Sequence, residues 1–255
     1  MKNMLPFERQ NKIKEALDEG VVFIAELAAS LNVSEITIRR DLKTLENEGK
    51  LVMLHGGAAK KIDTSRETAI AQRQGLYPDE KEIIGKLAAG LVEEGDVIFI
   101  DSGTTNITMI KHLTNKRISI VTNGYKTIEE ALRYNLPITS IGGELKKETM
   151  AFIGAITSRV LDMYAFDKCF LGTNGIDKEF GFSNADPNES LIKEQVIKRT
   201  KKAYIMADHS KFTDSSVFKF ADLADATIIT DEIPEEFNDV EKIIAYRQSN
   251  DSSGT

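Results

Sequence analysis

The sequence has few of the residues and segments on which several classes of protein depend. Its 255 residues include one cysteine, Cys169, so no internal disulfide can form, and the apolar neighbours Phe170 and Leu171 predict that this side chain is buried. Apolar runs such as Val97 to Ile100 are far shorter than the roughly 18 residues of a membrane-spanning helix, and residues 1–9 lack the apolar stretch of a signal peptide. We therefore expect a cytoplasmic protein that does not enter membranes.

The usual signatures of metal and nucleotide sites are also missing. The three histidines, His55, His112 and His209, lie far apart, and no pair of Cys or His residues has the spacing of metal ligands. Neither the Gly-rich dinucleotide fingerprint nor a Walker loop occurs. We expect no metal and no cofactor.

The charge is unevenly divided along the chain. The formal net charge of −7 argues against a protein coated with nucleic acid, but residues 1–61 carry ten Lys and Arg against nine Asp and Glu, a net charge of +1, which leaves −8 for the rest. Contact with DNA should therefore come from the first segment. A value of +1 is weak support, so the placement of the basic residues has to carry this interpretation.

Three helical patterns occupy the first fifty residues, at 7–19, 23–31 and 35–48. In the second, Ile24, Leu27 and Leu31 share one face, and in the third Ile38, Leu42 and Leu45 do the same. A tight turn at Asn32 and Val33 separates these two helices, and Ser34 is a natural N-cap for the third. The pattern predicts a helix-turn-helix, and the strand-like run 51–54 followed by the turn at 55–57 suggests a β-hairpin wing.

The opposite face of the third helix carries groups that suit a DNA major groove. Ile36, Arg40 and Lys43 lie there with Thr37 and Arg39 beside them, so the face offers cationic donors, a hydroxyl and an exposed apolar group. Alternatively, the basic residues solvate an ordinary surface helix and pair with Asp41 and Glu46. Because the spacing of the helices, the exposed Ile36 and the predicted wing are all typical of a DNA-binding domain, we favour DNA binding. The predicted contacts are Ser34, Ile36, Thr37, Arg39, Arg40, Lys43 and His55.

The run from Ser34 to Leu42, followed by His55-Gly56-Gly57-Ala58, resembles the DNA-binding signature of the DeoR family of bacterial transcriptional regulators. The resemblance continues to about Asp231. It favours repression as the function, and we expect a homo-oligomer, a dimer or a tetramer, that binds operator DNA. Its recognition helices would lie about 34 Å apart.

From Asp79 onward, helical stretches alternate with short β-rich runs, which predicts a parallel sheet covered by helices. The predicted strands are Val97 to Asp101, Ile118 to Val121, Ile138 to Ile141, Lys168 to Leu171, Tyr204 to Ala207 and Thr227 to Thr230. We expect a winged helix-turn-helix domain at 1–60, a linker at 61–78, an α/β domain at 79–247 and a flexible tail at 248–255. Residues 59–77, with Arg66 and Arg73, would transmit the effector signal.

Polar turns follow these strands, and the carboxyl ends of parallel strands share the edge where open α/β sheets bind ligands. The strongest element is Asp101-Ser102-Gly103-Thr104-Thr105, which leaves a strand and opens a helix predicted at 106–113, so its amides and hydroxyls can hold an anion. Such a loop can also be a purely structural turn. Several polar turns at one edge favour a ligand site.

The resemblance implies that this second domain senses a sugar phosphate and is related in fold to ribose-5-phosphate isomerase. On this basis Ser102 to Thr105 cradle the phosphate, Thr122, Asn123 and Gly124 line the sugar, and Asn174 to Asp177 occupy the position of the isomerase's acidic loop. Lys211, Glu189 and Lys193 would complete the site, although Lys211 could be a solvated lysine and the other two a surface ion pair. The full predicted set is Asp101, Ser102, Gly103, Thr104, Thr105, Thr122, Asn123, Gly124, Gly142, Gly143, Asn174, Gly175, Asp177, Glu189, Lys193 and Lys211.

A sugar-phosphate isomerase fused to a DNA-binding domain is the alternative. Asn174 stands where the isomerase pattern has a carboxylate, and an amide cannot act as a general acid or base, which favours sensing over turnover. Asp177 and Glu189 keep the enzyme reading open. A helix-turn-helix that binds something other than DNA is a third possibility, which the salt dependence of binding would test.

Overall fold

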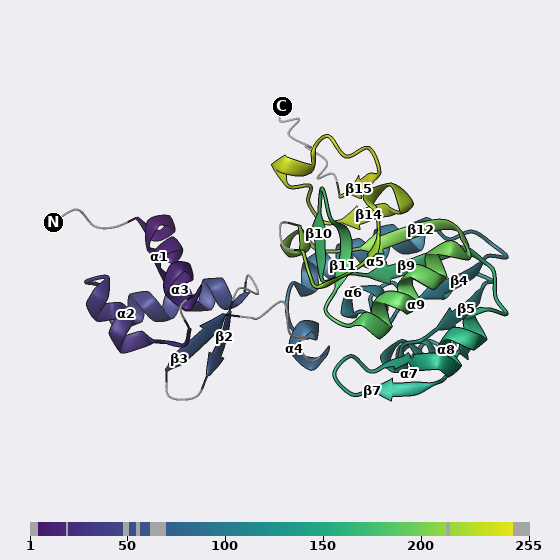
Figure 1. The fold of residues 1–255 in the computed structure, drawn as a ribbon, viewed down its shortest axis with the longest axis horizontal. Coiled ribbons are helices and arrows are strands. Elements are labelled where there is room, and N and C mark those ends of the chain that lie inside the picture. The colour runs from purple at the N-terminus through teal and green to yellow at the C-terminus, as the bar shows by residue number, and fades with distance from the viewer. Residues whose placement is uncertain are drawn as a thin grey trace, which may run out of the picture. The chain divides into compact units, whose positions relative to one another are not determined.

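The computed structural model describes residues 5–18, 20–47, 51–54, 57–61, 70–212 and 215–246. The chain divides into two compact units, Met1–Asp63 and Thr64–Thr255, and Figure 1 labels most of their helices and strands. His55, Arg66 and the expected tail at 248–255 lie outside the described residues.

The first unit is a winged helix-turn-helix. Helices α1 (Pro6–Asp18), α2 (Ile24–Ser30) and α3 (Glu35–Asn47) pack on strands β1 (Val22–Phe23), β2 (Leu51–Leu54) and β3 (Ala58–Lys61). The strands form an antiparallel sheet in the order β1-β3-β2, in which β2 and β3 are the wing. The apolar faces that the spacing predicted meet in one core, which includes Ile13, Leu17, Ile24, Leu27, Ile38, Leu42 and Leu45.

A buried ion pair joins α1 to α3. Arg9 Nη2 donates to Asp41 Oδ1 at 3.0 Å and its Nε donates to the other carboxylate oxygen, with both side chains almost fully buried. The reading of Asp41 as a surface partner for the basic residues of its own helix is therefore wrong. The pair fixes the helix that carries the exposed basic groups against the rest of the unit.

The second unit is built on seven parallel strands in the order β15-β14-β12-β9-β4-β5-β6. Their bounds are β4 Val97–Ile100, β5 Ser119–Thr122, β6 Ile138–Ser140, β9 Phe166–Gly172, β12 Thr200–Met206, β14 Thr227–Thr230 and β15 Ile243–Ala245. The first six correspond to the strands predicted from the sequence, whereas β15 was not predicted. The predicted fold class, a winged helix-turn-helix followed by a mainly parallel α/β domain, is confirmed.

Helices cover both faces of this sheet because alternate strand residues enter two separate cores. On one face, Ile98 and Ile100 pack with residues of α5 (Pro78–Gly90), the 3-10 helix η1 (Ile110–Leu113) and α7 (Tyr125–Arg133). On the other, Phe99 packs with residues of α8 (Gly154–Leu161) and α9 (Pro187–Lys198), and Cys169 is buried there as expected. No helix in the described part of the chain is long and apolar enough to cross a membrane.

Smaller elements surround this frame. An antiparallel sheet has the order β10-β11-β13, and β7 pairs with β8. Their bounds, with the remaining short helices, are α4 Ile70–Gln74, α6 Thr104–Ile107, β7 Glu144–Lys146, β8 Ala151–Ile153, β10 Gly175–Asp177, β11 Gly181–Asn184, η2 His209–Lys211, β13 Phe218–Ala221, η3 Leu223–Asp225 and η4 Glu235–Phe237.

Two predictions for this unit need correction. The single helix expected at 106–113 is instead α6 followed by η1, because the amides of Thr108 and Met109 bond to carbonyls only three residues back. Part of the segment expected as a linker, 61–78, is also ordered against the second unit: α4 carries buried Ile70, whose amide donates to the Glu148 carbonyl at 2.8 Å.

Candidate functional site

A polar cavity lies where the carboxyl ends of β4, β9 and β12 meet. Nine of the residues predicted to bind ligand line it together: Asp101, Ser102, Gly103, Thr104, Thr105, Asn174, Glu189, Lys193 and Lys211. They come from segments separated by more than a hundred residues, and the parallel order of the strands brings them to one edge.

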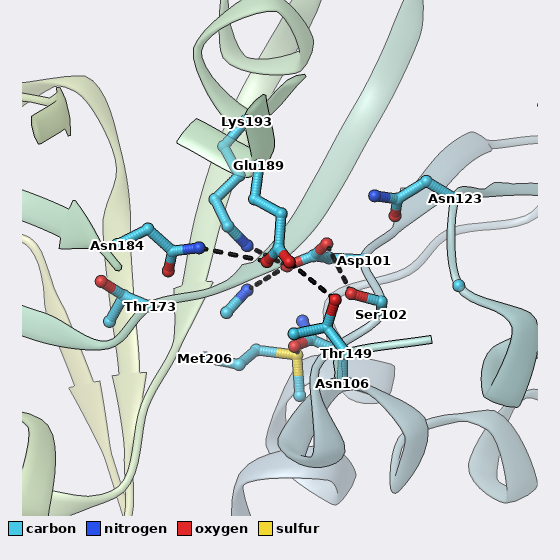
Figure 2. Close-up of polar contacts among 12 residues, drawn as sticks. Asp101, Ser102, Asn106, Asn123, Thr149, Thr173, Asn184, Glu189, Lys193 and Met206 are labelled. Carbon is cyan, nitrogen blue, oxygen red and sulfur yellow. Dashed lines mark hydrogen bonds and ion pairs between the residues drawn. The ribbon is translucent and has the colours of Figure 1, made fainter. Parts of the chain in front are cut away.

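The floor of the cavity is a buried ion pair between Asp101, directly after β4, and Lys193 of α9 (Figure 2). The side chains are only 4% and 5% exposed, and the Gly172 amide donates to Asp101 Oδ2 at 3.0 Å. Burial disfavours the charged carboxylate, but the charge and hydrogen bond of Lys193 outweigh it, so the pKa of Asp101 lies below its ordinary value. The reading of Lys193 as half of a surface pair with Glu189 is wrong, because both are buried and each has other partners.

Glu189, on the first turn of α9, accepts hydrogen bonds at both oxygens (Figure 2). Thr149 Oγ1 donates at 2.7 Å and Asn184 Nδ2 at 3.2 Å, while Lys146 Nζ lies 3.4 Å away. Asp186 caps the same helix by accepting from the amides of Asn188 and Glu189. Glu189 is thus a carboxylate whose oxygens already have partners.

Three further cations line the cavity without a carboxylate partner at ion-pair distance among the described residues: Arg73 of α4, Lys81 of α5 and Lys211 of η2. Lys81 Nζ donates to the Arg73 carbonyl. The pKa of Lys81 is lowered to about 8, chiefly by burial and also by the charges of Lys211 and Arg73, against the opposing effect of Asp208 and Glu80. Burial likewise lowers the pKa of Arg73, whose Nε is buried without a hydrogen-bond partner.

The loop Ser102-Gly103 reaches the cavity because glycine permits close backbone approach at two positions. A Cβ on Gly103 would lie 2.3 Å from Asn106 Oδ1, and one on Gly124 would lie 2.7 Å from the Ser102 Cα. Thr122 Oγ1 donates to the Ile100 carbonyl and accepts from the Gly124 amide at 2.9 Å, so it fixes this second loop against the first. Thr122 and Gly124 therefore have a structural role in holding the two loops together, and this role does not depend on a ligand.

The other predicted ligand residues, Thr122, Asn123, Gly124, Gly142, Gly143, Gly175 and Asp177, do not line the cavity. Asp177 Oδ1 accepts from the amides of Glu179 and Phe180 at 2.9 and 2.6 Å, so this carboxylate shapes the hairpin turn between β10 and β11. Gly143 packs tightly against α8, since a Cβ there would lie 2.0 Å from Thr157 Oγ1. Asn123 is buried with its Oδ1 unpaired and is drawn apart from the cluster around Asp101 in Figure 2.

The sequence did not identify several residues that line the cavity, among them Arg73, Lys81, Asn106, Asn184, Met206 and Asp208. For Lys81 a signal was present. It shares the buried face of α5 with Ile84, Gly85 and Ala88 at helical spacing, and a lysine on an apolar face needs an explanation. Among the described residues, no group of His, Cys, Asp or Glu is placed to hold a metal ion.

In the first unit, α3 presents an exposed face with the groups expected of a recognition helix. Ile36 is 79% exposed, and Arg39, Arg40 and Lys43 are exposed as well. Ser34 caps the helix by accepting from the Thr37 amide at 3.2 Å. The ion pairs Arg39–Glu35 (3.7 Å) and Lys43–Glu46 (2.9 Å) are solvent-exposed and hold these side chains only weakly.

Comparison with known proteins decides the family. A model described as the DeoR-like helix-turn-helix domain matches residues 9–64, and the DeoR C terminal sensor domain matches residues 77–232. The chain belongs to the DeoR family of transcriptional regulators. This confirms the resemblance to the DeoR family that the motif beginning at Ser34 indicated.

Several members of the DeoR family align along nearly the whole chain. It is 44% identical to the uncharacterized HTH-type transcriptional regulator FruR of Bacillus subtilis, over 91% of this chain and 93% of that protein. Identity is 32% to the HTH-type transcriptional regulator GlpR of Haloferax volcanii, over 89% and 91%. It is 29% to a lactose phosphotransferase system repressor of Staphylococcus aureus, over 94% and 96%.

Among solved structures, ribose 5-phosphate isomerase A from Methanocaldococcus jannaschii aligns with 53% of this chain and 55% of its own. The identity is 19% and the TM-score 0.41, so the similarity adds nothing to the family assignment.

Proposed function

We propose that the protein represses transcription by binding operator DNA through α3 and its wing, and that a phosphorylated sugar bound in the cavity of the second unit controls this binding. The observation that carries the proposal is the composition of the cavity. Three cations without carboxylate partners lie beside hydroxyl, amide and carboxylate groups, as an anionic group joined to a polyol requires.

The names of the relatives support the same proposal. A repressor of a lactose phosphotransferase system is similar along nearly its entire length, and such a system concerns a sugar. The exposed Ile36, Arg39, Arg40 and Lys43 provide the apolar and cationic groups that a major groove recognises.

Isomerisation of the sugar is the weaker candidate, because the carboxylates that it would need are engaged. Asp177 shapes a turn outside the cavity, Asp101 is paired with Lys193, and Glu189 accepts hydrogen bonds at both oxygens. A general base must be able to take a proton from the substrate, and saturated carboxylates are poorly suited to this. We propose that the protein is a sensor and not an enzyme.

The test uses full-length protein and DNA from upstream of its own coding sequence. Thermal shift is measured with fructose 1-phosphate, fructose 6-phosphate, glucose 6-phosphate, ribose 5-phosphate and glycerol 3-phosphate, with the unphosphorylated sugars as controls. We expect at least one phosphorylated compound to raise the melting temperature and to change DNA affinity in a fluorescence anisotropy titration. A coupling of roughly 1 to 3 kcal/mol would change that affinity about 5- to 150-fold.

If every compound leaves the protein unshifted, the sensor assignment fails. If a compound binds and is converted to its isomer, the enzyme reading replaces it. DNA affinity that does not fall with rising salt would contradict operator binding, because neutralising phosphates releases counterions.

A further inference from the structure

Three cations that line the cavity, Arg73, Lys81 and Lys211, have no carboxylate at ion-pair distance among the described residues. Lys81 interacts electrostatically with Asp208 and Glu80, and Arg73 with Glu189 and Asp101, but none of these carboxylates lies at ion-pair distance from either cation. Asp208 in turn accepts from the amide of Ser210 at 3.1 Å and from its hydroxyl. The cavity lining carries four cations, Arg73, Lys81, Lys193 and Lys211, and three carboxylates, Asp101, Glu189 and Asp208, and this excess of one positive charge favours an anionic ligand.

Arg73 has a donor that an anionic ligand would satisfy. Its Nε is buried and has no hydrogen-bond partner, and burial of an unsatisfied guanidinium donor is costly. A phosphate oxygen is the natural acceptor for this planar, always charged group, while the ammonium of Lys81 is held next to it by the Arg73 carbonyl.

Arg73 belongs to α4, which is the first described element after the winged helix-turn-helix unit. Three contacts hold α4 and the following turn against the rest of the second unit. The Ile70 amide donates to the Glu148 carbonyl at 2.8 Å, Lys81 donates to the Arg73 carbonyl, and the Tyr77 ring packs edge-on against His209 with the ring centroids 4.9 Å apart.

Resting on the proposed function, we propose that Arg73, Lys81 and Lys211 hold the phosphate of the effector, and that Arg73 thereby ties α4 to the occupied cavity. The cation cluster then recognises the phosphate, and the ordered polar groups around Asp101, Glu189 and Lys193 face the sugar. In the chain, α4 comes directly after the segment that leads from the DNA-binding unit. A ligand in the cavity would therefore restrain this helix, which is the part of the second unit nearest to that segment in the sequence.

The test measures the affinity of wild type, Arg73→Met, Lys81→Met and Lys211→Met for the phosphorylated sugar that gives the largest thermal shift, and for inorganic phosphate. Loss of one charged contact should weaken binding on the order of 10- to 100-fold for the first two variants, and less for the half-exposed Lys211. Lys86→Met is the matched control, since Lys86 is an exposed lysine on the same helix as Lys81, and its affinity should equal that of wild type.

Hydrogen exchange at the amides of α4 tests the second half of the proposal. Exchange should slow when ligand saturates the wild type and should not slow in Arg73→Met at saturating ligand. If Arg73→Met fails to fold, Arg73→Lys replaces it, and we expect an intermediate loss because the charge stays but the planar donor geometry is gone.

The outcomes separate this inference from the proposed function. If no sugar phosphate binds wild type, the proposed function has failed. If one binds wild type, and both Arg73→Met and Lys81→Met bind it within about threefold of wild type, the assignment of the phosphate to these cations is overturned while the sensor stands. If affinity falls but α4 exchange is unchanged by ligand, the tie to α4 is overturned.

Discussion

Replacing Asp101 by asparagine should strongly destabilise the second unit, because it leaves Lys193 buried without its counter-ion. The Lys193 side chain is 5% exposed and forms its ion pair with Asp101, and its ammonium lies 5.8 Å from the centroid of the Phe220 ring. Removing one partner of a buried ion pair costs about 3 to 5 kcal/mol. A domain has only about 5 to 15 kcal/mol of stability, so the loss is a large share of the total.

Urea unfolding followed by tyrosine fluorescence measures this loss in the second unit alone, because all six tyrosines lie between Tyr77 and Tyr246 and the protein has no tryptophan. The double variant Asp101→Asn, Lys193→Met should lose less than Asp101→Asn alone, since no buried charge is then left unpaired. Glu194→Gln removes one partner of the exposed Lys198–Glu194 pair on the same helix, and should change stability by less than about 1 kcal/mol.

The Asp101–Lys193 ion pair also makes the stability of the second unit fall at acid pH. The folded pKa of Asp101 is lowered, so its contribution is fully present above the unfolded pKa of about 3.9 and is lost as pH falls through the lower folded pKa. A loss below about 1 kcal/mol for Asp101→Asn, or a double variant whose loss equals the sum of the two single losses, would refute this account of the cavity floor.

The remaining predictions concern the cation cluster and the first unit. Because the pKa of Lys81 is lowered to about 8 and bound phosphate should raise it, effector affinity should be highest below that pKa and fall about tenfold between pH 7 and 9. Isothermal titration calorimetry at several pH values measures this affinity, and Lys81→Arg should abolish its pH dependence. The charged groups that face Lys81 are Arg73, Glu80, Asp208 and Lys211. Arg40→Ala should weaken operator binding by about 1 to 3 kcal/mol in anisotropy titrations, and equal loss of effector binding would instead indicate misfolding. Arg9→Met should destabilise the first unit by about 3 to 5 kcal/mol in circular dichroism melting, without moving the tyrosine transition of the second unit.

The fold was largely predictable because its elements are encoded locally. The apolar spacing of Ile38, Leu42 and Leu45 defined α3 to within a residue at its end, and glycine and polar turns marked the ends of six strands. Strand β15 was not predicted, although it lies in the apolar run 243–246, which is as long as the run 97–100 from which β4 was predicted. The division of 106–113 into two short helices follows from the three-residue hydrogen bonds of the Thr108 and Met109 amides, which no local sequence pattern marked.

The cavity was predictable only in part, because turn residues reveal a sheet edge but not what faces them from the helices. Glu189 and Lys193 share the buried face of α9 with Ile192 and Val196, so the helical spacing already argued against a surface ion pair. Their true partners, Asp101 and Thr149, lie 92 and 40 residues away in the chain. Contacts of that range follow from topology and not from spacing.

The distribution of partners within the cavity argues for binding over turnover. A catalytic carboxylate gains from a raised pKa and a free oxygen, whereas Asp101 has a lowered pKa and Glu189 has donors at both oxygens. The cations Arg73, Lys81 and Lys211 have no carboxylate at ion-pair distance among the described residues, and a cation can attract a phosphate but cannot remove a proton from carbon while it stays charged. An effector that satisfies Arg73 would therefore stabilise the unit without being changed by it, which is the behaviour that a reversible sensor requires.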